Sequence, residues 1–285
     1  MKFHVYQETR QGARHSNQDR IGYLYTKDCA ILILCDGMGG HYRGEVAAEF
    51  VVHYLAKAFR ALAQPTLKEP SQFLFKSIHA AHEALLRYAH KEGMVEVPRT
   101  TCVVAVIQDG KVCWAHVGDS RIHLIRDGVL HARSIDHSHV QMLIDANKIT
   151  QEQAAVHPER NKIFNCMGQP TPPRVDVQKS MPLKMNDYLM LCSDGLWGPV
   201  SIPLIVNTLN RCGVGIGVPM LMDLSESLSG RECDNVSAVA FKWMGQAGQP
   251  ETEDTFAHHR PVSDEDLSMA LMYVRGAILG HTVSG

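Results

Sequence analysis

The chain has 285 residues, and 45% of them are hydrophobic, which is ordinary for a soluble globular protein with a substantial core. The formal net charge of -2 gives no bulk electrostatic reason to expect nucleic acid or an anionic membrane as a partner. The longest apolar stretches, such as residues 29–35, are too short to span a bilayer. The first residues lack the hydrophobic region of a signal peptide, so we expect a protein without membrane insertion.

The first half of the chain predicts strands on either side of a helix pair. A strand begins near Val5 and leads into a polar turn that ends near Arg20. A continuous apolar run at residues 30–35 is typical of a strand buried on both faces. Further expected elements are helices at 45–62 and 71–90 and strands at 102–108 and 112–117. The last two strands are joined by Asp109 and Gly110, a strong hairpin signal.

The second half continues with further strands and helices and shows no internal repeat. The expected elements are strands at 121–126 and from 129, short helices at 137–147 and 150–156, strands at 175–181 and 188–193, helices at 202–212 and 219–228, and a final strand at 235–243. Asp127 and Gly128 turn the chain between the first two of these strands. Hairpin-joined strands with separate helix pairs predict an α+β fold of antiparallel sheets.

The composition shifts near Gly245 and divides the chain into three parts. We expect a globular domain over residues 1–244, a polar linker over 245–262 and an amphipathic tail helix over 263–285. The tail helix either packs on the domain or binds a partner, and the sequence leaves both alternatives open. The eight cysteines are scattered and form no CxxC pair, so we expect no zinc site of the usual spacing. Reduced, buried thiols favour a cytoplasmic location.

Aspartates in short turns marked by glycine or asparagine are the strongest chemical signal. They are Asp19, Asp36, Asp194 and Asp234, and most of them follow strand-like runs. Hard divalent cations such as Mg²⁺ and Mn²⁺ prefer oxygen ligands, so carboxylates gathered at strand ends predict a metal site. Two such ions activate a water molecule for attack on phosphorus, and a nearby arginine such as Arg14 could grip the phosphate.

Each of these motifs has a plain structural alternative. Asp-Gly is mostly a turn signal, and Arg14 taken alone would more often be a solvated surface residue. Asp119 lies in Gly-Asp-Ser, which could be a tight turn. Asp136 and His137 could simply cap the following helix. The metal hypothesis therefore depends on the joint order and spacing of the motifs.

Taken together, the motifs resemble the metal-dependent protein serine/threonine phosphatases of the PP2C (PPM) family in their bacterial single-domain form. The resemblance covers about residues 5–243 and depends on segments in this order: Arg14-x-x-Asn17-Gln18-Asp19, Asp36-Gly37-Met38-Gly39-Gly40-His41, Thr100-Thr101, Gly118-Asp119-Ser120-Arg121, Asp136-His137-Ser138, His157-Pro158-x-Arg160-Asn161, Ser193-Asp194-Gly195-Leu196-Trp197 and Asp234-Asn235-Val236-Ser237. It implies an αββα sandwich of two antiparallel sheets flanked by helix pairs. It also implies two Mn²⁺ or Mg²⁺ ions, with a third at a weaker site.

The resemblance also implies roles for the matching residues. Asp36 would bridge both metals, the Gly37 carbonyl would bind one of them, and Asp194 and Asp234 would bind the other. Asp19 would belong to the metal shell through a water molecule. Asp119 would join Asp194 at the third site, and Arg14 would bind phosphate. Residues 136–161 match the flap beside the active site, which tunes substrate choice.

The sequence departs from the family pattern at three places, of which the smallest is Gly198, where an acidic residue is common after Trp197. Gln18 stands where the family often has glutamate, which removes a negative charge from the metal shell. Asn165-Cys166-Met167-Gly168 replaces the usual Arg-Ala-Leu-Gly after the flap. None of these departures alters the aspartates, so we expect activity to survive.

The expected function is therefore metal-dependent hydrolysis of phosphoserine and phosphothreonine in proteins, reversing a bacterial kinase. The expected partners are phosphorylated proteins, including a cognate kinase, with no nucleic acid, and a further partner for the tail helix remains an alternative. Gln18 and Asn165 motivate a second hypothesis, a catalytically weak domain that binds phosphoproteins without rapid hydrolysis. A nuclease is less favoured because no basic stripe faces a polyanionic backbone.

Overall fold

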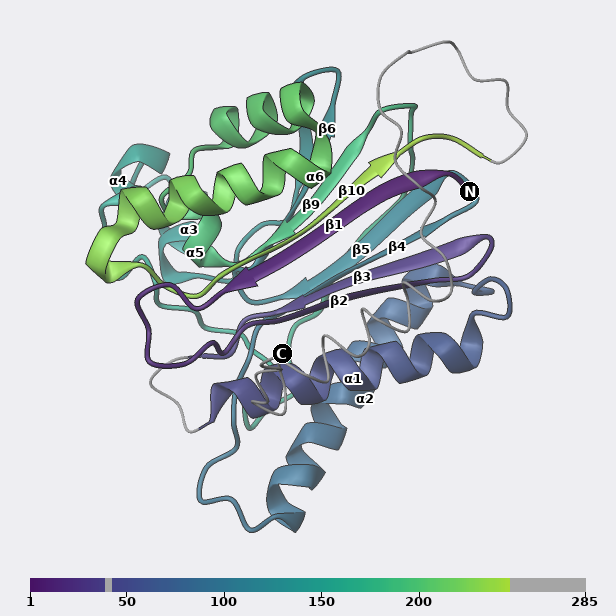
Figure 1. Ribbon diagram of the computed structural model, residues 1–285. Coiled ribbons are helices and arrows are strands. Elements are labelled where there is room, and N and C mark those ends of the chain that lie inside the picture. Colours follow the sequence, from purple (N-terminus) through teal and green to yellow (C-terminus); the bar gives the residue numbers. More distant parts are fainter. Residues whose placement is uncertain (39–42, 247–285) are drawn as a thin grey trace, which may run out of the picture. The chain divides into compact units, whose positions relative to one another are not determined.

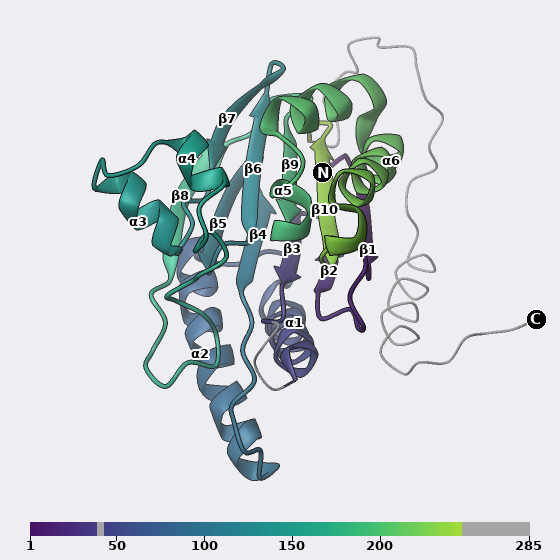
Figure 2. The ribbon, with the colours of Figure 1, turned by 90° about the vertical axis from the view of Figure 1, so that its left-hand side faces the viewer.

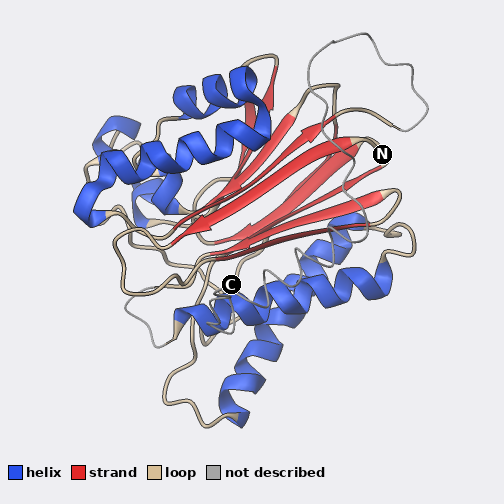
Figure 3. Cartoon of the chain, in the orientation of Figure 1, coloured by secondary structure: helices blue, strands red, loops and turns tan. Residues whose placement is uncertain are grey.

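The computed structural model describes residues 1–38 and 43–246, and their strands form two antiparallel five-stranded sheets (Figures 1 and 3). The first sheet contains, in spatial order, β1 (Phe3–Arg10), β10 (Val236–Trp243), β9 (Tyr188–Cys192), β6 (Arg121–Arg126) and β7 (Val129–Arg133). The second contains β2 (Arg20–Tyr25), β3 (Cys29–Cys35), β4 (Cys102–Gln108), β5 (Lys111–Val117) and β8 (Asp176–Pro182).

Helices cover the outer face of each sheet, which confirms the predicted α+β sandwich (Figure 2). The second sheet is covered by α1 (Gly44–Leu62) and α2 (Pro70–Lys91), and the first is covered by α6 (Ile202–Ser229). The remaining helical elements are α3 (His139–Asp145), α4 (Gln151–Ala155), α5 (Asp194–Trp197) and the 3₁₀ turn η1 (Gly230–Glu232).

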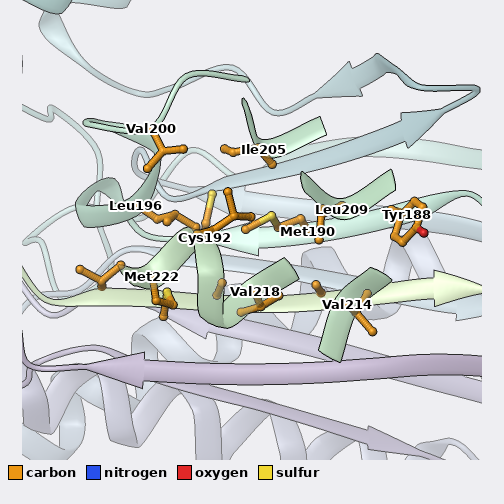
Figure 4. Close-up of a cluster of buried hydrophobic side chains, with 14 of the residues drawn as sticks. Tyr188, Met190, Cys192, Leu196, Val200, Ile205, Leu209, Val214, Val218 and Met222 are labelled. Atoms are coloured by element: carbon orange, nitrogen blue, oxygen red, sulfur yellow. The ribbon is translucent and has the colours of Figure 1, made fainter. Parts of the chain in front are cut away.

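Two apolar cores hold these layers together. Between the sheets, Leu32 and Leu34 of β3 belong to one buried cluster with Leu191, Val239 and Phe241 of the first sheet. The second core lies between the first sheet and α6 (Figure 4). Its members include Met190, Cys192, Leu209, Val218 and Met222. Burial of this apolar surface stabilises the sandwich and fixes the strand ends that carry the aspartates.

The two predicted hairpin turns are confirmed. Asp109 and Gly110 have φ of 54° and 66°, and Asp127 and Gly128 have φ of 51° and 75°. Positive φ at both central residues is the geometry that matches the twist of paired strands. These two Asp-Gly pairs are therefore turns, as the sequence indicated.

The structure corrects the prediction at several elements. The expected helices at 202–212 and 219–228 are one element, α6, interrupted by Gly213 with φ 67° and ψ -177°. Strand β2 and the short helix α5 were not predicted, because neither has a long periodic pattern. Asp136 and His137 do not cap α3, since the Ser138 side chain accepts from the backbone N–H of Gln141. The thiols are free cysteines, as expected.

Among the described residues, residues 202–232 form one helical stretch long and apolar enough to cross a membrane. Length and composition are weak grounds here, because core helices share them, and α6 packs against β1 and β10. The linker and tail helix expected at 245–262 and 263–285 lie almost wholly outside the described residues, as do Gly39, Gly40 and His41 of the first aspartate motif.

Candidate metal and phosphate site

Four predicted aspartates lie at the ends of paired strands. Asp19 directly precedes β2, and Asp36 directly follows β3, its antiparallel partner. Asp194 follows β9 after one residue, and Asp234 lies just before β10, which pairs with β9. The two strand pairs belong to different sheets, so the sandwich brings carboxylates from four distant segments of the chain to one place.

Asp19 is the most deeply buried aspartate of this group, and Asp36 lies close enough for the two charges to interact. Burial raises the pKa of Asp19 to about 7. One of its carboxylate oxygens accepts from Ser193 Oγ at 2.8 Å, while Oδ1 is buried without a hydrogen-bond partner in residues 1–38 and 43–246. Desolvation also raises the pKa of Asp36 well above its ordinary value, and the charges of Asp19 and Asp194 raise it further. These carboxylates therefore repel one another.

Asp194 and Asp234 form the more open part of the site. Desolvation raises the pKa of Asp194 to about 6, and the neighbouring charge of Asp234 adds to the rise. Asp234 keeps 35% of its side chain exposed and accepts from the Arg14 guanidinium at 2.7 Å. Arg14 is itself 55% exposed, so the predicted phosphate residue lies at the solvent side of the carboxylates.

Asp119 joins the same electrostatic group from the loop between β5 and β6. It is buried, and burial raises its pKa well above the ordinary value, with the charge of Asp194 as the next cause. The structure therefore brings the predicted third-site pair, Asp119 and Asp194, within electrostatic reach of each other. The sequence alone left open whether Gly118-Asp119-Ser120 was only a turn.

Backbone contacts hold the aspartate loops in fixed positions. The N–H of Gly37 donates to the Gln18 carbonyl at 3.2 Å, and the N–H of Gln18 donates to Asn235 Oδ1 at 2.8 Å. A Cβ on Gly37 would lie 2.5 Å from the carbonyl carbon of Gly44, so only glycine fits where the loop meets α1. Gln18 thus connects the loop that contains Asp36 with the loop that contains Asp234.

The donor set fits hard divalent cations. Five aspartates meet here and offer carboxylate oxygens. The pKa values of Asp19, Asp36, Asp119 and Asp194 are raised because burial and like charges disfavour ionisation. Uncompensated carboxylates at partly buried positions are costly unless cations neutralise them. Asp36, Asp194 and Asp234 keep partial solvent access, which leaves room for the waters that Mg²⁺ and Mn²⁺ retain.

Sequence reasoning missed Glu45 and the contact it makes. The Gln18 side chain donates through Nε2 to Glu45 Oε2 at 3.1 Å, in the first turn of α1. The amide of Gln18, which replaces the family's usual glutamate, therefore donates to a carboxylate. A lone glutamate one residue after Gly44 carries no motif, and only its place in the first helical turn could have drawn attention to it.

The flap predicted at residues 136–161 contains α3 and α4. At its base, Asp136 accepts from Arg121 at 2.7 and 3.0 Å. The Arg121 guanidinium lies 3.5 Å from the centre of the Trp197 ring, and Trp197 Nε1 donates to the Asp119 carbonyl at 3.1 Å. The base of the flap is thereby tied to the segment that contains Asp194.

Another group of potential metal ligands lies at the flap base. Suitable atoms of His116, His137 and Asp176 lie within 4.8 Å of one another. However, Asn165 Nδ2 donates to His137 Nδ1 at 2.6 Å, so the neutral ring carries its proton on Nε2, the atom 3.2 Å from Asp176. That nitrogen has no lone pair for a metal. The aspartates therefore form our candidate metal site.

Comparison with known proteins identifies the family. The family model for protein phosphatase 2C matches residues 7–211, and the chain belongs to the protein phosphatase 2C family. The serine/threonine phosphatase stp of Listeria monocytogenes is 37% identical over 185 residues, which are 64% of this chain and 73% of that protein.

Solved structures agree. The serine/threonine phosphatase Stp1 from Staphylococcus aureus matches with a TM-score of 0.79 and 32% identity, covering 86% of this chain and 96% of that one. The catalytic domain of the serine threonine protein phosphatase PstP, solved in complex with two manganese ions, matches with a TM-score of 0.71 and 29% identity. The match covers 85% of this chain and 99% of that one.

Proposed function

We propose that this protein is a protein serine/threonine phosphatase that requires Mn²⁺ or Mg²⁺. The observation that carries the proposal is the convergence of Asp19, Asp36, Asp194 and Asp234, whose mutual repulsion at partly buried positions calls for divalent cations. The family and the names of the relatives support the same activity. We assign two ions to the site and a third, weaker one to Asp119 with Asp194.

Each residue has a distinct role in this proposal. Asp36 would be shared by the two ions, the Gly37 carbonyl would bind one of them, and Asp194 and Asp234 would hold the other. Asp19 would belong to the outer shell and orient bound water. Bound divalent cations supply charge neutralisation and lower the pKa of a water molecule near the phosphorus atom.

Arg14 binds the phosphate group of the substrate. Its guanidinium already contacts Asp234 at 2.7 Å, so a phosphate oxygen has to replace or share that contact. Arginine suits this role because its planar fork matches two phosphate oxygens at once. The exposed half of the side chain supports access from solvent, where a phosphorylated loop of a protein substrate would approach.

The experiment compares the protein with its Asp36→Ala variant. We expect hydrolysis of p-nitrophenyl phosphate and of a phosphothreonine peptide in Mn²⁺, and no such turnover by the variant. Equal rates for the two proteins would reject the proposal. The alternative of a weak phosphoprotein-binding domain predicts tight phosphopeptide binding with negligible hydrolysis at saturating Mn²⁺, so the same assay separates the two.

We infer that the substrates are phosphorylated proteins in the cytoplasm, including those of a cognate kinase and the kinase itself. Free, mostly buried cysteines support a reducing compartment. Phosphoproteomics of a strain that carries Asp194→Asn would identify the sites, because those that accumulate phosphate are candidate substrates. No accumulation at any site in that strain would contradict the inference.

We further propose that residues 1–244 form the catalytic domain, with a linker at 245–262 and a tail helix at 263–285 that either packs on the domain or binds a partner. Deletion of residues 246–285 tests the tail. Loss of a partner in pull-down with an unchanged melting temperature would support partner binding. A strong fall in melting temperature with unchanged pull-down would show that the helix packs on the domain.

A further inference from the structure

The backbone on the N-terminal side of Asp119 is held by a histidine of the flap base. Gly118 has φ of 102°, and a Cβ there would lie 2.7 Å from Thr101 Cγ2, so the turn depends on glycine. The Gly118 N–H donates to His137 Nδ1 at 3.2 Å. The backbone orientation just before the Asp119 carboxylate is therefore set by a side chain outside the aspartate group.

Asn165 fixes which nitrogen of His137 accepts. Its Oδ1 accepts from the Arg174 N–H at 2.9 Å, and its Nδ2 donates to the Arg174 carbonyl at 2.8 Å, so the amide cannot be reversed. The second N–H of the same Nδ2 then points to His137 Nδ1 at 2.6 Å. Both Asn165 and His137 are buried, so Nδ1 remains an acceptor for two donors.

The backbone on the C-terminal side of Asp119 is held by a side chain that is linked to the flap base. Trp197 Nε1 donates to the Asp119 carbonyl at 3.1 Å, and Trp197 lies three residues after Asp194. Arg121 covers the Trp197 ring at 3.5 Å and bonds Asp136, the residue before His137. The two flanks of Asp119 are thus connected through neighbouring residues of the flap base.

We propose that His137 and Asn165 are positioning residues for Asp119, and that they set the affinity of the weak cation site formed by Asp119 and Asp194. This inference rests on the proposed function, because it takes the two carboxylates as ligands. Outer-shell groups that orient a ligand commonly change metal affinity without touching the ion. Here the control passes through the peptide that joins Val117 to Gly118, whose N–H donates to His137 Nδ1 one residue before Asp119.

The side chain of Asn165 suits this role. Its amide both accepts from and donates to the Arg174 backbone inside a buried site, so its polar atoms are satisfied there. Burial, with the adjacent His116 ring as the next cause, lowers the pKa of His137 to about 4. The imidazole therefore stays neutral and keeps its acceptor at neutral pH.

The test measures Mn²⁺ binding to the full chain by isothermal titration calorimetry and electron paramagnetic resonance. His137→Leu removes the acceptor, whereas His137→Asn keeps an oxygen near the Nδ1 position. Asn165→Asp keeps the shape but presents an acceptor to Nδ1, which moves the imidazole proton and deprives Gly118 of its partner. His139→Leu is the matched control, because His139 is a partly exposed histidine of the same flap that contacts Glu159.

We expect His137→Leu and Asn165→Asp to weaken the third Mn²⁺ by about tenfold or more, with the first two ions unchanged. His137→Asn and His139→Leu should stay close to the parent protein. An unchanged third affinity in both damaging variants would overturn the proposal, as would a parent protein that binds only two ions. Equal loss at all sites with a lower melting temperature would show a structural role only. Failure of the proposed phosphatase activity would appear separately, in hydrolysis assays of the parent protein.

Discussion

An aspartate lies at each end of strand β9, and the two carboxylates have different surroundings. At the start of the strand, Asp187 is buried and is bonded by Arg126 at 2.6 and 2.9 Å and by the Lys184 N–H at 2.8 Å. Beyond the other end, Asp194 faces the like charges of Asp36 and Asp234, and its pKa rises to about 6. A carboxylate with a full set of protein partners supports the fold, and one without them has capacity left for cations.

The largest expected effect is the loss of activity in Asp194→Asn. The change removes a proposed ligand, so kcat/KM in Mn²⁺ should fall at least about a hundredfold, the upper range for outer-shell changes. The metal-free variant should melt higher than the metal-free parent, because one repelling charge is gone from a crowded site. Steady-state kinetics and calorimetry after chelation measure the two effects. A metal-free variant that melts lower would contradict this account of the site.

The opposite result is expected for Asp187→Asn. Loss of the Asp187 carboxylate leaves Arg126, whose side chain is only 12% exposed, without its ion-pair partner. This loss should lower the unfolding free energy by about 3–5 kcal/mol. Urea denaturation measures this loss, and hydrolysis per folded molecule should stay near the parent value. Asp127→Asn is the control, since that turn residue is exposed and asparagine accepts its positive φ. A stable but inactive Asp187→Asn protein would contradict the proposed difference between Asp187 and Asp194.

Between the two ends, β9 lies beside a histidine that is buried without charge. His123 Nδ1 lies 3.8 Å from Cys192 Sγ, and burial lowers the pKa of His123 from 6.5 to about 3. Between these values the unfolded chain binds more protons than the folded one, so unfolding free energy falls as pH falls. The contribution is about 1.4 kcal/mol per pH unit.

His123→Leu tests this contribution. The variant should lose less stability than the parent between pH 6.5 and 4 in denaturant titrations. His53→Gln, on the exposed face of α1, is the control. Parallel pH profiles for the parent and His123→Leu would show that this histidine does not govern acid sensitivity.

The aspartates could be found from the sequence because strand ends and glycines are local features. Asp36 and Asp194 each follow an apolar strand and precede a glycine, so a short window is enough to mark them. The contacts that position them are not local. Ser193 bonds Asp19 across 174 residues, and Arg14 bonds Asp234 across 220. Such contacts follow only once two sheets have packed, and a single sequence does not show how their ends meet.

The same limit explains the missed elements. Strand β2 alternates weakly, and its residues become a strand because Ile21 and Leu24 pair along the strongly apolar β3. The gap expected at residues 213–218 was wrong beyond its first residue. The helix is interrupted at Gly213 alone and continues at once, since Val214 and Val218 pack in the core between α6 and the first sheet. Tertiary packing therefore decided what local propensity left open.

The smallest expected effect concerns Gln18, where the chain gives up a charge beside Asp19. The Gln18 amide donates to Glu45 at 3.1 Å. One negative charge therefore remains nearby, but it belongs to residue 45 rather than to residue 18. Gln18→Glu should tighten Mn²⁺ binding by up to about tenfold. The metal-free protein should become less stable, because two carboxylates then face each other.

The double variant Gln18→Glu with Glu45→Gln separates the amount of charge from its position. It has the same net charge as the parent and restores the hydrogen bond in the opposite direction. If position decides, its Mn²⁺ affinity follows the single Gln18→Glu variant; if the amount decides, it follows the parent. We expect the former, because residue 18 adjoins Asp19 and its carbonyl holds Gly37 at 3.2 Å. A negative charge at residue 18 acts on the ions directly, whereas a charge at residue 45 acts through the intervening amide of Gln18.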